Sequence, residues 1–193
     1  MEDRITKFLQ AVGEKNLLLV KHLLDAGQSP SEPSDCGNTP LCNAVQARSI
    51  EMIGLLLEYG ADINERITYV SPVDGRVKKE YTPLMYASDE EVVRYLCGRG
   101  AEINYQAPNG LSLLMLCASV ASAEYVGLVK LLISLGACKE LVAESYKGTR
   151  GKFTALAIAE EEERFLRALN KKYHSEKLDA AIEYITEMQR ILR

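Results

Sequence analysis

Apolar residues recur along the chain in short clusters with helical spacing, and most clusters end at a glycine. The segments IEMIGLLLEYG and VGLVKLLISLG, for example, place leucine, isoleucine, valine and methionine on one face of a helix. Glycine suits the left-handed residue that closes a helix, and it follows four of these clusters, at Gly27, Gly60, Gly100 and Gly136. The pattern predicts amphipathic helices that cannot bury their apolar faces alone and have to stack on one another.

The clusters belong to an internal repeat with a period of 33 residues, which separates Thr39 from Thr6 and Gly60 from Gly27. The segments NTPLCNA, YTPLMYA and GLSLLMLC begin three copies, and FTALAIA begins a partial last copy. Each of these segments contains a threonine or serine of the type that caps a helix. Twice this residue is followed by proline, which suits the first position of a helix.

The 33-residue period and the Thr-Pro-Leu motif resemble the ankyrin repeat. The resemblance covers nearly the whole chain, but the family's usual histidine after the leucine is replaced in every copy, by Leu9, Cys42, Met85, Met115 and Ala157. The family implies an all-α helical solenoid with β-hairpin fingers. We expect one domain, 1–193, with repeats at about 5–37, 38–80, 81–109 and 110–150 and a C-terminal capping repeat and helix at 151–193.

Two of the fingers are longer than the repeat requires. Asn64 to Thr82 spans 18 residues, whereas the equivalent span in the next repeat is 8. The inserted residues 67–77 hold two β-prone runs around a Pro- and Asp-Gly-containing turn, which predicts an elongated hairpin with its tip near residues 72–75. Residues 142–151 are a second insertion at the same place in their repeat. Such insertions often form a binding face, although long passive loops are also tolerated.

The repeat pattern ends after Ala159 in a run of four glutamates, residues 160–163. A last helix then carries apolar residues on one face, namely Leu178, Ala181, Ile182, Ile185, Met188 and Leu192. We expect this helix to cap the array, and a helix that binds a partner or a second copy is the alternative. The glutamate run is interpreted as a solvated face, or else as an acidic surface for a basic partner.

Composition and charge favour a soluble globular protein over a nucleic-acid-binding or membrane protein. The net charge of −4 gives no electrostatic reason to expect nucleic acid as a partner. The longest apolar runs, such as residues 111–120, are shorter than the roughly 20 residues of a membrane span, and the N-terminus lacks an apolar signal core. Five cysteines without a CxxC pair do not indicate a disulfide framework. We therefore expect a cytoplasmic monomer that does not insert into membranes.

Motifs that would indicate catalysis are missing from the sequence. His22 and His174 lack metal-ligand spacing, and there is no GxSxG, HExxH or complete phosphate loop. The segment GTRGK resembles part of a phosphate loop but lacks its GKS or GKT ending. We expect a protein that is not an enzyme and has no catalytic, metal or cofactor site. An enzyme with an unrecognised site is the remote alternative.

Asn64 and Asn104 end equivalent runs of glycine, alanine, an acidic residue, isoleucine and asparagine. In the ankyrin family similar asparagines accept hydroxylation in animal cells. The preferred interpretation is that both shape their turns through side-chain hydrogen bonds.

By its resemblance to ankyrin arrays, the chain is expected to bind a partner protein through a concave face made of the fingers and the first helix of each repeat. The alternative is an inhibitor that blocks the active site of a partner enzyme or toxin. The predicted contact residues combine the variable positions of the family with exposed-type residues of the long fingers. They are Asn38, Gln46, Ala47, Tyr69, Asp74, Arg76, Lys79, Tyr81, Asp89, Glu90, Asn109, Leu111, Ser119, Val120, Tyr146, Lys147, Arg150, Phe153, Glu161 and Glu162.

Overall fold

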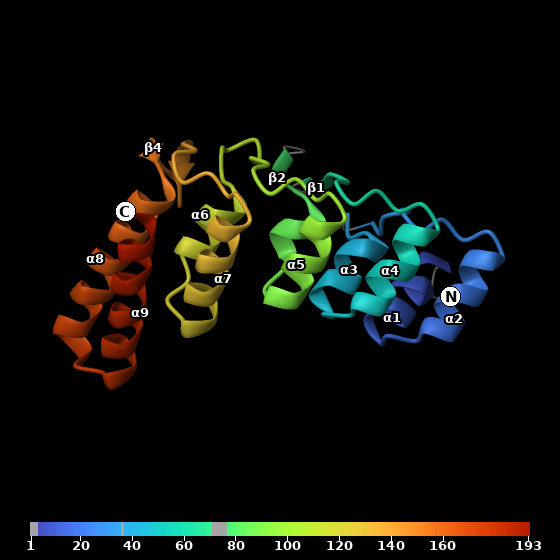
Figure 1. Cartoon of the computed structure of the whole chain (residues 1–193), viewed down its shortest axis with the longest axis horizontal. Coiled ribbons are helices and arrows are strands. Elements are labelled where there is room, and N and C mark those ends of the chain that lie inside the picture. The colour runs from blue at the N-terminus through green and yellow to red at the C-terminus, as the bar shows by residue number, and fades with distance from the viewer. Residues whose placement is uncertain (1–3, 36, 71–76) are drawn as a thin grey trace. The chain divides into compact units, whose positions relative to one another are not determined.

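The computed structural model describes residues 4–35, 37–70 and 77–193, and it describes residues 69, 70 and 77–79 by their backbone alone. These residues form a mostly helical fold with small strand hairpins (Figure 1). In chain order the elements are α1 (Arg4–Gly13), α2 (Leu17–Asp25), α3 (Pro40–Gln46), α4 (Ile50–Glu58), β1 (Ile67–Val70), β2 (Val77–Tyr81), the 3-10 helix η1 (Pro83–Tyr86), α5 (Glu90–Gly98), α6 (Leu113–Ala118), α7 (Ala123–Ser134), β3 (Ala143–Tyr146), β4 (Thr149–Phe153), α8 (Ala155–Tyr173) and α9 (Glu176–Leu192).

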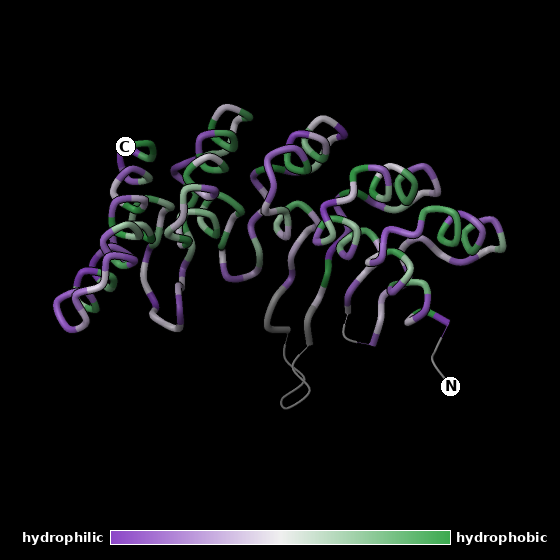
Figure 2. Tube along the Cα trace, turned by 90° about the horizontal axis from the view of Figure 1, so that it is seen from below, coloured by the Kyte–Doolittle hydropathy of each residue, from purple (hydrophilic) through white to green (hydrophobic). Residues whose placement is uncertain are grey.

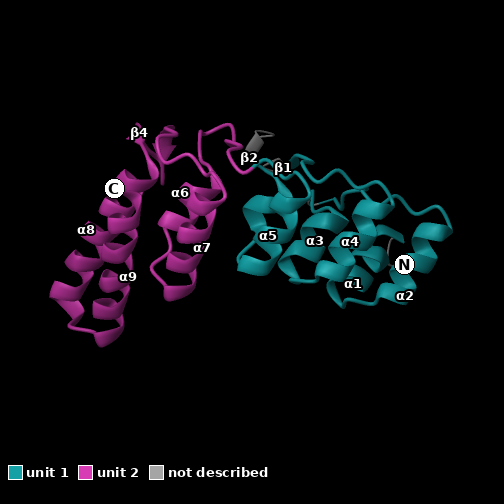
Figure 3. Cartoon of the chain, in the orientation of Figure 1, with its two compact units in different colours: residues 1–102 teal, residues 103–193 magenta. Residues whose placement is uncertain are grey.

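The chain divides into two compact units, residues 1–102 and 103–193, and each is built from stacked helix pairs (Figure 3). In the first unit, α3 packs against both α1 and η1, and α2 packs against α4. In the second unit, α6 packs against α8, and α7 packs against α9. The first helices of the pairs thus contact one another, as do the second helices. In each unit the hairpin lies at one end of the helices (Figure 1).

The predicted capping residues begin the helices. The hydroxyl oxygens of Thr39, Ser112 and Thr154 accept hydrogen bonds from the backbone N–H three residues later, at 3.2, 3.4 and 3.2 Å. The copy that begins at Thr82 differs, because it opens with the four-residue helix η1 and its threonine makes no side-chain cap bond. The first helix of that repeat is therefore reduced to a single 3-10 turn.

Small residues let the first helices of each unit approach closely. The equivalent positions of the five copies are buried, with exposed fractions from 0% to 4%, at Ala11, Ala44, Ala87, Cys117 and Ala159. Larger apolar side chains such as Phe8, Leu41 and Leu114 fill the space between them and are also buried. Figure 2 shows hydrophobic stretches recurring from helix to helix along the chain. The core of each unit therefore follows the repeat.

Asn64 and Asn104 link the ends of consecutive second helices. The Asn64 side-chain amide donates to the carbonyl of Gly100 at 3.1 Å, and its oxygen accepts from the Glu102 N–H at 2.9 Å. Asn104 makes the same pair of bonds one repeat later, to the Gly136 carbonyl and the Cys138 N–H, at 3.1 and 2.8 Å. Each asparagine thus joins two repeats rather than shaping only its own turn.

Two glycines bring neighbouring fingers close together. Gly37 and Gly110 have φ angles of +83° and +84°, where a side chain is strained. A Cβ atom at Gly37 would lie 2.8 Å from the Thr68 carbonyl oxygen, and one at Gly110 would lie 2.7 Å from the Ala143 Cα. Beside the second contact, the Gln106 side-chain amide donates to the carbonyls of both Gly110 and Val142, at 2.6 and 3.1 Å.

We predict that Gly110→Ala destabilises the second unit more than Gly136→Ala. Both glycines have a positive φ, at which alanine costs roughly 1–2 kcal/mol, but a Cβ at Gly136 meets nothing within 4 Å. The clash with the Ala143 backbone should add at least about 1 kcal/mol. Urea unfolding followed by circular dichroism measures the difference, and equal midpoints for the two variants would contradict the described contact.

Candidate partner-binding surface

The β3–β4 hairpin contains four of the predicted contact residues, and its turn is built from two residues. Lys147 and Gly148 have φ angles of +48° and +82°, as a tight hairpin turn with positive φ at both central residues requires. Tyr146 pairs with Thr149, and Ser145 pairs with Arg150. The register then shifts, because β4 has one more residue than β3 before Ala143 pairs with Phe153. This bulge bends the strand that carries Arg150.

A single buried carboxylate anchors the hairpin on α8. The Glu162 Oε1 atom accepts hydrogen bonds from the Tyr146 hydroxyl at 2.5 Å and from the Lys147 ammonium at 2.6 Å. Glu162 and Tyr146 are only 8% and 7% exposed, whereas 62% of the Lys147 side chain is accessible. Burial and the bond to Glu162 raise the pKa of Tyr146, so its hydroxyl stays protonated and keeps donating.

Aromatic rings surround this anchor. Phe153 packs beside Tyr146, with the ring centroids 5.9 Å apart. The Lys147 ammonium lies 5.4 Å from the centroid of the Tyr146 ring and 6.0 Å from that of Phe165 on α8, which are cation–π distances. Phe165 remains 57% exposed. The hairpin therefore presents a positioned ammonium group next to an accessible aromatic ring.

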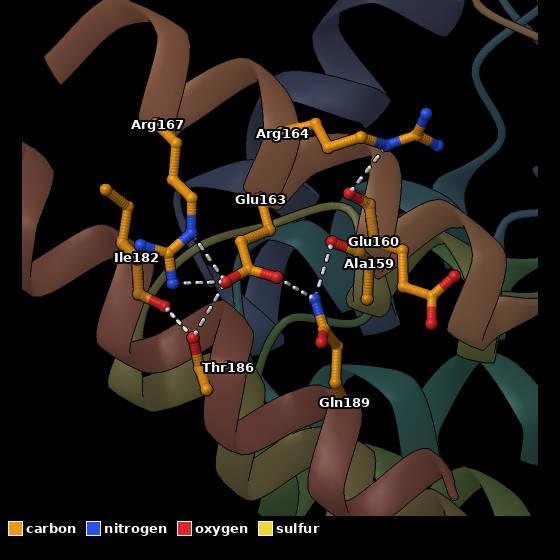
Figure 4. A network of polar contacts seen from close by, with 8 residues as sticks. All are labelled: Ala159, Glu160, Glu163, Arg164, Arg167, Ile182, Thr186 and Gln189. Carbon is orange, nitrogen blue, oxygen red and sulfur yellow. Dashed lines mark hydrogen bonds and ion pairs between the residues drawn. The ribbon is translucent and has the colours of Figure 1, made fainter. Parts of the chain in front are cut away.

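A second carboxylate fixes α8 against α9 (Figure 4). The Glu163 Oε1 atom accepts from two nitrogens of Arg167, at 2.8 and 2.6 Å, and from the Thr186 hydroxyl at 3.3 Å. Its other oxygen accepts from the Gln189 side chain at 2.7 Å. The bond from Gln189 and then the bonds from Arg167 hold the pKa of Glu163 below its ordinary value. Two adjacent glutamates thus hold the hairpin and the last helix in place.

The β1–β2 hairpin is connected to α3 through a third glutamate. The Thr39 hydroxyl, which caps α3, donates to the Glu65 side chain just before β1. Burial raises the pKa of Glu65 to about 7, against the lowering effect of this bond. Asp62, Thr68 and Glu65 line a cavity of about 300 Å³ there. Burial beside the cap of α3 therefore explains the raised pKa of Glu65 by structure alone.

The predicted contact residues differ widely in exposure. Those at the surface are Asn38, Gln46, Glu90, Asn109, Val120, Lys147, Arg150 and Glu161. Half-buried are Ala47, Tyr81, Asp89, Ser119 and Phe153. Asp74 and Arg76, with the expected finger tip, lie outside the described residues, and Tyr69 and Lys79 are described only as a backbone pair.

The expectation that Tyr146 is exposed is corrected, and Leu111 and Glu162 are buried as well. Tyr146 turns inward because Glu162, sixteen residues away, offers its hydroxyl an acceptor. Sequence reasoning missed Phe165, although one aromatic residue inside the charged segment EEEERFLR could have indicated an exposed ring. The structure brings Tyr146, Lys147 and Glu162 together and places Ser119 near the same hydroxyl.

Within the described residues, no three His, Cys, Asp or Glu side chains are grouped so that they could hold a metal ion. None of the helices in this part of the chain is long and apolar enough to cross a membrane.

Comparison with protein families agrees with this architecture. A model of ankyrin repeats in three copies matches residues 8–107, slightly more than half of the chain. The chain belongs to the ankyrin repeat family. Ankyrin repeats are generally protein–protein interaction modules, and the family is typically not enzymatic. No curated protein matches the sequence.

We predict that Tyr146→Phe destabilises the second unit of this ankyrin repeat protein by about 1.5–3 kcal/mol, the range for a hydrogen bond to a charged group. The substitution leaves the ring in place but removes a donor from the buried Glu162. Tyr173→Phe is the matched control, because Tyr173 is 60% exposed and should change stability by less than about 0.5 kcal/mol. Denaturant unfolding of both variants is the measurement, and similar losses would show that the Tyr146 hydroxyl contributes nothing.

We predict a pH-dependent effect of Glu65→Gln. A carboxyl whose pKa is raised to about 7 in the folded chain stabilises the fold most below pH 4.5, and this stabilisation is lost as the pH rises through 7. Glutamine keeps an acceptor for Thr39 and does not ionise. The variant should therefore be more stable than the wild type at pH 8, by roughly 1–2 kcal/mol after solvent screening is allowed for, and not at pH 4.5.

Unfolding free energies measured from pH 4.5 to pH 8 test this prediction. Glu58→Gln is the control, because this exposed glutamate on α4 belongs to the same unit. If the unfolding free energies of the wild type and Glu65→Gln change with pH in the same way, the raised pKa of Glu65 is disproved.

Proposed function

We propose that the chain is a protein-binding module that contacts its partner through the hairpins and the first helices of its repeats. Membership of the ankyrin family supports this proposal, and the observation that carries it is the anchored β3–β4 hairpin. This hairpin holds exposed residues, Lys147 and Arg150, on a base that is fixed by the buried Glu162. The family match ends at residue 107, and we propose that residues 110–193 continue the same repeat array.

Preorganisation is the physical reason why this surface suits binding. A two-residue turn, a buried hydrogen bond and an ion pair restrict the hairpin before any partner arrives. Association then loses less conformational entropy, so more of the contact energy appears as affinity. Exposed positions at the ends of the first helices extend the surface in each unit, for example Gln46 at the end of α3 and Val120 just after α6.

Affinity capture with two matched double variants tests the proposal. Gln46→Arg with Val120→Arg places one large charged side chain on the first-helix side of each unit. Leu18→Arg with Leu135→Arg does the same on the second-helix side, where both leucines are exposed, at 85% and 37%. We expect a partner identified by mass spectrometry to be captured by the wild type and the second variant and reduced about tenfold or more with the first, a loss of about 1.4 kcal/mol.

Equal capture by both double variants would contradict the proposed surface, provided that circular dichroism shows both to be folded. If the captured protein is an enzyme, its activity with and without the chain separates inhibition from passive assembly.

A further inference from the structure

The acidic residues near the β3–β4 hairpin are largely neutralised within the chain. Of the four consecutive glutamates in α8, Glu162 is bound to Tyr146 and Lys147, and Glu163 is bound to Arg167. Glu161 forms an ion pair with Arg164 at 2.6 Å. Glu160 lies two residues before Glu162, and because successive residues of a helix are rotated by about 100°, it points away from the hairpin. The glutamate run therefore presents little free negative charge beside β4.

The basic residues of the hairpin are in the opposite situation. Arg150 and Lys152 are exposed on β4, and within the described part of the chain neither side chain takes part in a hydrogen bond or an ion pair. Lys147 keeps most of its side chain accessible although it is bound to Glu162. Glu144 is the one acidic residue in the segment 143–153. The hairpin thus carries excess positive charge on a chain whose net charge is −4.

An accessible apolar group adjoins one of these cations, the Lys147 ammonium. Phe165 is 57% exposed and lies within cation–π distance of the Lys147 ammonium. Aromatic rings next to arginine or lysine are typical of the residues that contribute most to protein interfaces. A ligand that satisfies the whole surface would bring carboxylates to Arg150 and Lys152 and an apolar side chain to Phe165.

We propose that the β3–β4 hairpin, with Phe165, binds an acidic segment of a partner protein that contains at least one large apolar residue. This inference rests on the proposed function and adds the chemistry of the partner. A protein segment fits better than a nucleic acid, because the hairpin has two unpaired basic side chains, whereas nucleic acids carry a charge on every nucleotide and are bound through a larger set of lysines and arginines. Charge complementarity of this kind fixes partner choice and speeds association.

Synthetic peptides measured by fluorescence anisotropy test the proposal on the full chain. The probe is a labelled eight-residue peptide of six glutamates around two leucines. The comparison ligands are the same peptide with lysine for glutamate and a single-stranded eight-nucleotide DNA. We expect the wild type to bind the acidic peptide best, with an affinity that falls as salt rises.

Arg150→Glu with Lys152→Glu should weaken this binding about tenfold or more, and Phe165→Ala should weaken it severalfold. The matched control is Lys171→Glu with Lys177→Glu, which makes the same charge change at exposed positions of α8 and α9 and should leave binding within about twofold. Arg150→Gln with Lys152→Gln should give an intermediate loss, which separates charge from misfolding.

Absence of binding to the wild type, equal losses in the two charge-reversed variants, or tighter binding of the basic peptide or of the DNA would each overturn the inference. The capture experiment distinguishes this failure from that of the proposed function. If the wild type and Arg150→Glu with Lys152→Glu capture a partner equally well, the proposed protein-binding function stands, and the proposal of an acidic partner segment at this hairpin is refuted.

Discussion

Every helix pair of this chain has an apolar face that it cannot bury by itself, and the rest of the structure follows from this constraint. Stacking buries first helix on first helix through small residues such as Ala44 and Cys117. The amides of Asn64 and Asn104 then tie the end of one repeat to the next with two hydrogen bonds each. The helices and these asparagines thus secure each stack without a contribution from the hairpin turns.

The position of the β3–β4 hairpin depends on one buried charge, the carboxylate of Glu162. A carboxylate removed from water is costly unless donors replace its hydration, and Glu162 has both a hydroxyl and an ammonium group as donors. Both come from the hairpin, so moving the hairpin away would leave a buried charge without partners. The same interaction that lowers the cost of burial therefore also fixes the orientation of the hairpin.

The helices could be predicted from the sequence because their signals are local. The residues next to each cap in the repeat motif already identify the capping position. The helices are capped there by Thr39, Ser112 and Thr154. The two short fingers can also be recognised locally, because a glycine lies two residues before the capping residue in each of them. These glycines are Gly37, before Thr39, and Gly110, before Ser112. Glu80 and Lys152 occupy that position in β2 and β4. The burial of Tyr146 could not be predicted in this way, because its cause is a side chain on another element, brought near only by folding.

The surface charge, like the burial of Tyr146, depends on tertiary contacts that the sequence does not reveal. The net charge of −4 and the four consecutive glutamates of α8 suggest an acidic surface, and a partner chosen from composition alone would be basic. Folding reverses this near the hairpin, because three of the four glutamates pair with Lys147, Arg164 and Arg167, while Arg150 and Lys152 remain without counter-charges among the described residues. A ligand responds to the unpaired charges within about a Debye length of its site rather than to the sum over the chain. The internal ion pairs of α8 therefore determine the sign of the field that an approaching partner meets at this finger.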